Sequence, residues 1–118
     1  MPDYVTINRN SDFRRIYNRG ISSADPALVI YLMKNRAGIC RIGITSSKKI
    51  GNAVQRNRSR RIIRAAFDEL YRQDPARFCG YDIVFVARTK TRFRKSTQIK
   101  DIIDQGFEKS SKAKRQIS

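Results

Sequence analysis

The residues best suited to chemistry in this chain are the basic ones between Lys48 and Arg64. Seven Lys or Arg occupy these seventeen positions, with no Asp or Glu among them. Like charges this close repel one another unless a polyanion neutralises them. Five of the seven are arginine, whose planar guanidinium can hold a phosphate through two parallel hydrogen bonds or stack on a base. The stretch therefore predicts binding of nucleic acid.

Charge along the whole chain is uneven as well as strongly positive. The 118 residues include 26 Lys or Arg and 10 Asp or Glu, which gives a formal net charge of +16. Acidic residues are absent from positions 26–67, which hold ten basic residues, and from positions 83–100, which hold six. A solvated helix normally mixes the two signs, since opposite charges four positions apart stabilise it. The segregation therefore indicates a basic binding surface.

The chain offers no segment for insertion into a membrane. Its apolar runs fall well short of the roughly 18 residues that span a bilayer. Its first residues, MPDYVTINRN, lack the apolar centre of a signal peptide. We expect a soluble, cytoplasmic protein with no membrane partner.

Residues for catalysis by the protein itself are scarce. The chain has no histidine, and Cys40 and Cys79 stand far apart without a CxxC pair, so we expect two reduced thiols in or near the core and no metal bound by a protein motif. A metal-dependent nuclease remains an alternative, with Asp82, Asp101 and Asp104 as its only nearby carboxylates. These carboxylates are more typical of a strand-entry residue and a solvated helix face than of a metal site. We expect no protein catalytic residues.

The first half of the chain predicts one helix and two strands that must support the basic stretch. A helix over residues 10–20 begins with Asn10 or Ser11 as its cap, places Phe13 and Tyr17 on one face and ends at Gly20. Residues 27–35 alternate between two apolar faces, which is typical of a strand inside a sheet. Residues 38–47 form a second strand with one apolar face.

The second half predicts two longer helices around one more strand. Asn52, after Gly51, caps a helix that runs to about residue 72, with Ile63, Ala66, Phe67 and Leu70 as its core stripe. An apolar strand over 80–89 and a helix over 96–111 follow. The tail, 112–118, is expected to fray. The order predicts a small α+β sandwich and a single RNA-binding domain over residues 1–118.

The basic residues do not all share one face of the predicted helix 52–72. Asn52, Arg56, Arg60 and Arg64 form one ridge at i,i+4 spacing, which we expect at a border of the sheet. Arg58 and Arg61 point to other sectors, so the partner must contact the helix from more than one side. A folded RNA can do this more readily than a straight duplex. The helix N-terminus, preceded by Lys48 and Lys49, is a candidate phosphate seat.

The segment SKKIGNAVQRNRSRRIIRAAF closely resembles the signature of the protein subunit of bacterial ribonuclease P. Its hallmark Arg-Asn-Arg motif stands here at Arg56, Asn57 and Arg58. The resemblance extends through DFRRIYNRG, LVIYLMKN, RIGIT and YDIVFVAR, and so covers most of the chain. Two positions depart from the pattern, Ser46, where the family usually has an apolar residue, and Ser59, where it often has a β-branched one.

The resemblance implies an architecture and a division of labour. The architecture is α-β-β-β-α-β-α with a left-handed βαβ crossover, as in a class of ribosomal proteins and in domain IV of elongation factor G. The RNA subunit carries the catalytic site and uses Mg²⁺ to remove the 5′ leader of precursor tRNA. The protein acts as accessory subunit of this endoribonuclease, binding the catalytic RNA and the leader.

The resemblance also assigns residues to each partner. Those expected to bind the RNA subunit are Lys48, Lys49, Asn52, Arg56, Asn57, Arg58, Arg60, Arg61 and Arg64. Those expected to bind the precursor-tRNA leader, in a cleft between the first helix and the sheet, are Phe13, Tyr17, Tyr31 and Arg41, with Gly43 leaving space beside them for the backbone. A general or ribosomal RNA-binding protein is an alternative that charge alone supports, whereas a helix-turn-helix is disfavoured because strands flank the basic helix.

Overall fold

Five strands and three α-helices follow one another in the computed structural model, which describes the backbone of residues 3–117 and the side chains of residues 3–112. In chain order they are β1 (Val5–Thr6), α1 (Asn10–Arg19), β2 (Ile21–Asp25), β3 (Leu28–Lys34), β4 (Arg41–Thr45), α2 (Ala53–Gln73), β5 (Tyr81–Ala87) and α3 (Ser96–Ile117). Three 3-10 turns, η1 (Lys48–Ile50), η2 (Pro75–Phe78) and η3 (Thr91–Phe93), lie between them. None of the helices described is long and apolar enough to cross a membrane.

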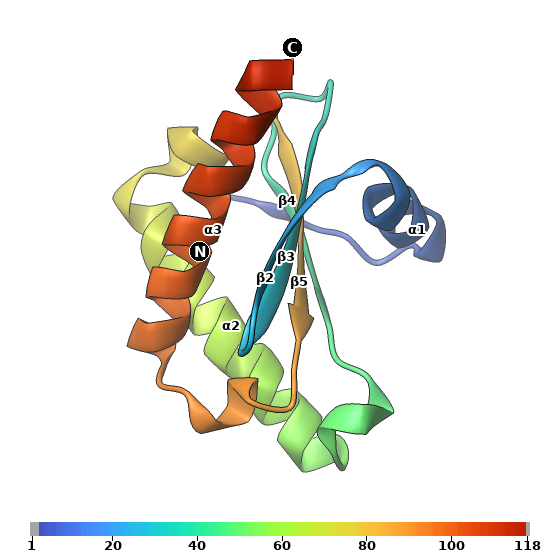
Figure 1. Cartoon of the computed structure of the whole chain (residues 1–118), viewed down its shortest axis with the longest axis vertical. Helices are drawn as coiled ribbons and strands as arrows, with labels where there is room; N and C mark the ends of the chain where they lie inside the picture. Colours follow the sequence, from blue (N-terminus) through green and yellow to red (C-terminus); the bar gives the residue numbers. More distant parts are fainter. Residues whose placement is uncertain (1–2, 118) are drawn as a thin grey trace.

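The strands form one mixed sheet, seen nearly edge-on in Figure 1, and their order is β1-β4-β5-β3-β2. β4 pairs parallel with β5, and α2 connects them, whereas β3 pairs antiparallel with both β5 and β2. The expected order α-β-β-β-α-β-α is therefore confirmed. β1 precedes it as a two-residue strand parallel to β4, which the sequence did not indicate. The left-handed sense of the crossover stays a prediction.

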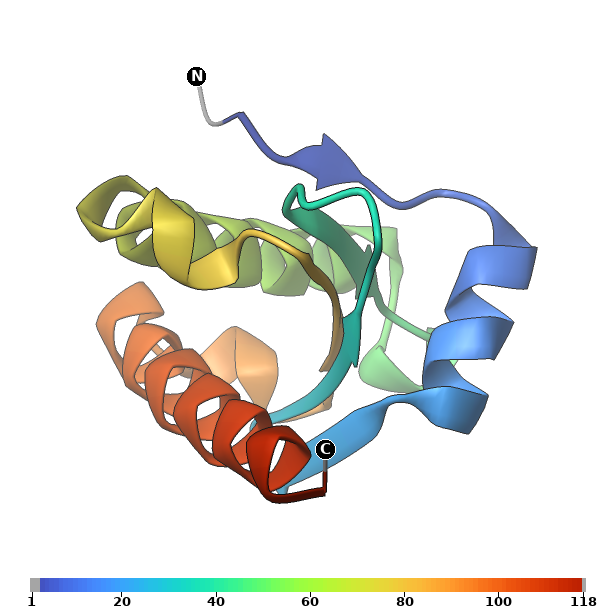
Figure 2. The same ribbon diagram turned by 90° about the horizontal axis from the view of Figure 1, so that it is seen from above.

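Helices cover both faces of the sheet, α2 and α3 on one side and α1 on the other (Figure 2). The two apolar faces of β3 explain this layering. Leu28, Ile30 and Leu32 are fully buried in the larger core, beneath α2 and α3. Tyr31 and Met33 pack in the smaller cluster beneath α1. Burial on both sides is what a strand inside a sheet requires.

The start of α2 is fixed by its own side chains. Asn52 is the N-cap and accepts a 3.0 Å hydrogen bond from the backbone N–H of Gln55, while the Gln55 side chain accepts one from the N–H of Asn52. Gly51 before the cap has φ 140°, a backbone conformation that favours glycine. The predicted core stripe of α2 is buried throughout, so cap and face are both confirmed.

The details of α1 differ from the prediction. Its N-cap is Arg9, with no side-chain hydrogen bond, and Asn10 is already helical, so the predicted cap is wrong. Ile16 is the residue that α1 buries completely. Phe13 lies beside it, partly buried, whereas Tyr17 remains exposed. The predicted end of the helix at Gly20 is confirmed.

Two further expectations concern the cysteines and the C-terminal segment. Cys40 is buried, and this burial raises the pKa of its thiol to about 12, whereas Cys79 is exposed, so of the two only Cys40 lies within the core. The predicted inner face of α3 is confirmed, with Ile99, Ile103 and Phe107 buried. The side chains of 113–118, in the tail expected to fray, lie outside the described residues.

Candidate nucleic-acid interface

The predicted arginine ridge follows the border between α2 and the open edge of the sheet. Arg56 donates to the carbonyl of Gly51 at 2.8 Å, and Arg60 reaches the carbonyl of Ile44, near the end of β4, at 3.4 Å. β1 pairs only with residues 41 and 42 of β4, which leaves this part of the edge without a neighbouring strand. The ridge at a sheet border is therefore confirmed.

Arg64, the last member of the ridge, belongs to a polar cluster with Tyr4 and Asp68. Its Nη1 donates to the Tyr4 hydroxyl at 2.9 Å, and that hydroxyl donates to an Asp68 carboxylate oxygen at 2.5 Å. The pKa of Tyr4 is raised to about 12, mainly by burial and secondly by the hydrogen bond to Asp68. Arg64 therefore helps to anchor the N-terminal segment, whereas Arg60 is exposed and makes one long contact.

Arg58 and Arg61 lie on the other flank of α2, as the helical spacing predicts. They line an open groove of about 810 Å³ together with the segment that joins β5 to α3. Arg92, Phe93, Arg94 and Lys95 form the opposite wall of this α2–η3 groove. Cations therefore stand on both flanks of the helix.

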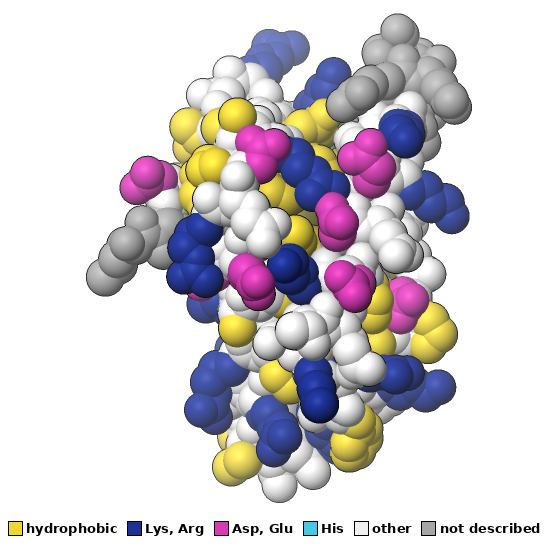
Figure 3. Space-filling model, turned by 90° about the vertical axis from the view of Figure 1, so that its left-hand side faces the viewer, with side chains coloured by type: hydrophobic (Ala, Val, Ile, Leu, Met, Phe, Trp, Pro, Cys, Tyr) yellow, Lys and Arg dark blue, Asp and Glu magenta, His cyan; other side chains and the backbone are white. Residues whose placement is uncertain are grey.

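Basic side chains gather at one end of the face that carries α2 and α3. Figure 3 views the side on which α2 and α3 lie: Asp and Glu gather in its upper and middle parts, whereas the lower end carries Lys and Arg with hydrophobic side chains between them. That end holds the start of α2 and η3 (Figure 1). The nine residues assigned to the RNA subunit all lie in η1, the cap or the first three turns of α2. Within the described part of the chain, none of them forms an ion pair.

The predicted phosphate seat is only partly available. The capping box of Asn52 and Gln55 already occupies the N–H groups of these two residues. The amides of Ala53 and Val54 remain to face an anion beside the exposed Lys48 and Lys49. The lysine side chains, more than the helix end, are what this turn offers to a phosphate.

The three aromatic rings assigned to the leader come together between α1 and β3. The Tyr17 and Tyr31 rings meet edge to face with centroids 4.9 Å apart, and Phe13 stacks on Tyr17 at 6.3 Å. Tyr17 is 36% exposed, whereas Phe13 and Tyr31 are partly buried against the smaller core. The group is thus a partly open aromatic surface and not a closed core.

The space expected above Gly43 is filled. A Cβ at this position would lie 2.6 Å from Cε1 of Phe13, closer than any carbon contact allows. The Phe13 ring therefore rests directly on the glycine backbone. The prediction of an open track beside Gly43 is wrong, and this glycine serves to let α1 approach the sheet.

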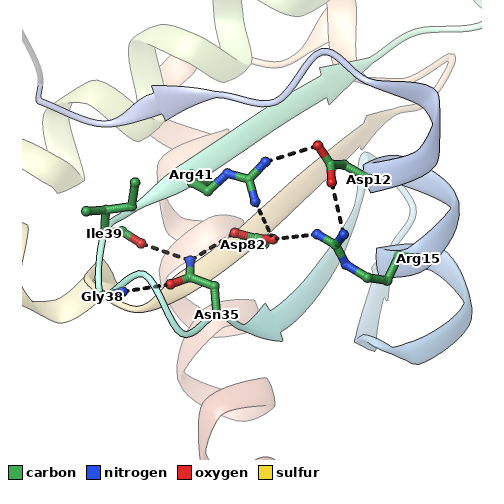
Figure 4. A network of polar contacts seen from close by, with 7 residues as sticks. All are labelled: Asp12, Arg15, Asn35, Gly38, Ile39, Arg41 and Asp82. Carbon is green, nitrogen blue, oxygen red and sulfur yellow. Dashed lines mark hydrogen bonds and ion pairs between the residues drawn. The ribbon is translucent and has the colours of Figure 1, made fainter.

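Arg41 is engaged in a four-member ion-pair network (Figure 4). It joins Asp12 of α1 at 3.1 Å and Asp82 of β5 at 3.2 Å, and Arg15 joins the same two carboxylates at 3.0 and 3.3 Å. Asn35 donates a further hydrogen bond to Asp82, which is 1% exposed. Arg41 thus ties α1 to the sheet and offers no free charge. The sequence missed this network, since Arg41 and Asp82 are remote along the chain from each other and from the Asp12–Arg15 pair of α1.

A second groove joins the aromatic surface to the arginine ridge. This edge groove, of about 600 Å³, is lined by Thr6, Ile7, Asn8, Phe13, Ile44, Thr45, Ser46, Arg60 and Arg64. Phe13 enters it from the α1 side and the two arginines from the α2 side, with the end of β4 as its floor. Ser46, one of the departures from the family pattern, contributes a polar wall. The two predicted sites therefore meet at one edge of the sheet.

The carboxylates considered for a nuclease site do not assemble. Asp82 faces α1, whereas Asp101 and Asp104 lie on α3, across the sheet (Figure 1). Asp104 pairs with Arg77 at 2.6 Å. In residues 3–112, no group of three or more acidic, Cys or His side chains is arranged to hold a metal ion. Asp82 and the two carboxylates of α3 therefore do not share a site.

Comparisons with known proteins agree with the geometry. The Ribonuclease P family profile matches residues 1–111. A ribonuclease P protein component of Clostridioides difficile is 43% identical over 100 residues, covering 81% of this chain and 80% of that protein. One from Pelotomaculum thermopropionicum is 40% identical over 97 residues, covering 82% and 84%. The solved RNase P protein of Staphylococcus aureus superposes with a TM-score of 0.73 at 33% identity, covering 87% of this chain and 92% of that chain. The RNase P protein of Thermotoga maritima, at 24% identity and a TM-score of 0.70, shares the fold.

Proposed function

The chain belongs to the ribonuclease P protein family, and from this premise we propose that it is the protein subunit of a ribonuclease P that matures the 5′ end of tRNA. It binds the catalytic RNA subunit through η1 and the first turns of α2. The observation that carries this proposal is the set of exposed cations on both flanks of α2 without ion pairs in the described chain. Phosphate contacts from such cations supply most of the affinity for RNA.

The 5′ leader of precursor tRNA is the second partner we propose, and the edge groove is its site. A single strand can stack bases on Tyr17 and Tyr31 and then run past Phe13 toward Arg60. Stacking on aromatic rings has little sequence preference, which suits a site that accepts many leaders. Arg41 acts here by holding α1 in place through Asp12 and Asp82.

Catalysis is assigned to the RNA subunit, with Mg²⁺ bound by that RNA. Mg²⁺ prefers carboxylate and phosphate oxygens, and RNA supplies the latter in abundance. The carboxylates nearest the proposed leader path are already committed, since Asp12 and Asp82 both pair with Arg15 and Arg41. The protein's part is to bind, orient and neutralise the two RNAs.

Reconstitution tests the proposal. RNA-free protein should leave precursor tRNA intact, and adding it to the RNA subunit should restore 5′ cleavage at moderate Mg²⁺. A Tyr17→Ala holoenzyme should bind precursor tRNA more weakly while its affinity for mature tRNA, which has no leader, stays the same. Arg14→Ala, on the exposed side of α1, is the matched control. Cleavage by the protein alone would refute the assignment of catalysis, and equal loss for both tRNAs would refute the leader site.

A further inference from the structure

The α2–η3 groove contains an exposed aromatic ring that the leader site and the arginine ridge do not use. Phe93 is 73% exposed, although it stands in the middle of a basic segment. One exposed apolar side chain needs no explanation by itself. This ring, however, lines an open groove whose other walls carry Arg58, Arg61, Arg94 and Lys95.

The backbone that carries Phe93 is held firmly in place. Thr91, two residues earlier, is fully buried, and its hydroxyl accepts a 2.9 Å hydrogen bond from the N–H of Arg88 and donates to the carbonyl of Ala27. Arg92 donates to the carbonyl of Ile50 in η1. η3 is therefore anchored both to the sheet and to the turn before α2.

Arg92 also backs the ring. Its guanidinium carbon lies 4.7 Å from the centroid of the Phe93 ring, a distance typical of a cation–π contact. Because that guanidinium is held by the carbonyl of Ile50, it covers one side of the ring and leaves the rest to solvent. With 73% of its surface exposed, Phe93 leaves room for a planar group to stack on its ring.

The surrounding charges suit a polyanion. Arg58, Arg61, Arg94 and Lys95 are exposed and make no ion pair with a described carboxylate. On the groove side of α2, the first acidic side chain is Glu69, one turn beyond Ala65, which lines the groove. Glu69 pairs with Lys100 at 3.0 Å, and this pair marks the end of the free positive charge.

We propose that the α2–η3 groove binds a single-stranded segment of RNA, with one unpaired base stacked on Phe93. Phosphates on either side of that base lie against Arg58 and Arg61 on α2 and against Arg94 and Lys95 on the opposite wall. A duplex would not fit this description, because the faces of its bases are already stacked on one another and cannot stack on the ring. The identity of this strand as part of the catalytic RNA rests on the proposed function. The stacking site itself is argued independently of that function.

The absence of tryptophan from the chain makes a direct test possible. A Phe93→Trp variant carries a single tryptophan in place of the exposed ring, so its fluorescence reports on the proposed stacking site alone. We expect a ten-nucleotide single-stranded RNA to quench that fluorescence. The same oligonucleotide with abasic positions, which keeps the phosphates and removes the bases, should quench far less.

The matched control is Ile39→Trp, which places the only tryptophan at an exposed position of the β3–β4 turn. Its fluorescence should not respond to either oligonucleotide. Equal quenching of both tryptophan variants, equal quenching by intact and abasic RNA, or no quenching at Phe93→Trp would each overturn the stacking site.

Binding to the catalytic RNA separates this proposal from the general function. Phe93→Leu keeps an apolar side chain and removes the ring, and should weaken binding of that RNA by roughly 5- to 160-fold, the range for loss of one stacked base. If Phe93→Leu kept the wild-type affinity for the catalytic RNA while Arg60→Ala bound it more weakly, the stacking site at Phe93 would be refuted and the proposed function would be retained. If the wild-type protein failed to bind the catalytic RNA while Phe93→Trp was still quenched, the function would fall and the single-strand site would remain.

Discussion

Arg60→Ala is the sharpest test of the arginine ridge. Arg60 is exposed and makes one long contact, at 3.4 Å, to the carbonyl of Ile44, so its replacement should change the free energy of unfolding by less than about 0.5 kcal/mol. Arg64→Ala, by contrast, breaks a 2.9 Å hydrogen bond to Tyr4 and should destabilise the fold by about 1 kcal/mol. A loss of RNA affinity in Arg60→Ala can thus be assigned to the interface.

The size of that loss follows from counterion release. Each phosphate contact contributes roughly 0.7 to 0.9 to the slope of log K against log salt. Removing one contact should weaken binding by about 11-fold at 0.05 M salt and by about 4-fold at 0.2 M, if counterion release is the whole effect. The ratio of wild-type to variant affinity should therefore fall by about 3-fold over this range.

A salt titration of binding to the RNA subunit, by filter retention or fluorescence anisotropy, measures the slope directly. Arg14→Ala removes the same charge from the exposed side of α1 and should leave the slope unchanged. Slopes equal to that of the wild type in Arg56→Ala, Arg60→Ala and Arg64→Ala would refute the reasoning, because the ridge would then be structural.

Three further changes test the packing behind the site. Gly43→Ala would place its Cβ 2.6 Å from Phe13 Cε1, so thermal unfolding should show a loss of about 1–3 kcal/mol; an equally stable variant would contradict this contact. Asp82→Asn should lower the free energy of unfolding by about 1.5–3 kcal/mol, because two arginines lose their shared carboxylate. Asp101→Asn, on the exposed side of α3, should lower it by less than about 0.5 kcal/mol. Equal losses in the two variants would show that the ion-pair network does not stabilise the fold. Tyr4→Phe removes a hydroxyl whose pKa is raised to about 12, chiefly by burial. A tyrosine in the unfolded chain has a pKa of about 10, so the stabilisation from this hydroxyl is complete below pH 10 and is lost as the pH rises to 12. Urea unfolding of the wild type and of Tyr4→Phe should therefore show that their difference in free energy of unfolding shrinks between pH 10 and 12. A difference that stays constant over this range would contradict the link between the pKa and stability.

Elements whose apolar residues repeat with one period were predictable from the sequence. In β3 both faces are apolar, and burial beneath helices on each side follows from that pattern. In α2 the cap Asn52, followed three residues later by Gln55, starts a helix whose buried stripe keeps its spacing as far as Leu70. These features depend on neighbours within a few turns of the chain, and so they can be identified locally.

Features that depend on distant partners were not predictable. Val5 and Thr6 form a strand only because β4 lies alongside, and no local pattern marks them. Arg15 and Arg41 count as free positive charge in the sequence, whereas the fold pairs both with Asp12 and Asp82. The net charge of +16 therefore overstates the free charge near α1.

Phe93 illustrates the same limit within the site. In the sequence it is an apolar residue between two arginines, and no local pattern marks it as exposed. The fold buries Thr91, whose hydroxyl donates to the carbonyl of Ala27, the residue just before β3. The turn of η3 then directs Phe93 outward. The buried side chain is thus the one that bonds to a partner 64 positions away along the chain.

The distribution of charge along α2 follows from its place between two grooves. Arg60 and Arg64 open toward the edge groove and Arg58 and Arg61 toward the α2–η3 groove, so a partner that neutralises all of them must pass on both sides of the helix. An acidic residue on either flank would face that partner, which accounts for the missing i,i+4 ion pairs. The first carboxylates of α2 occur where both grooves end. Asp68 accepts a hydrogen bond from Tyr4 beside Arg64, and Glu69 pairs with Lys100 beyond the last groove residue of α3. The change of sign along the helix thus coincides with the border of the proposed RNA interface.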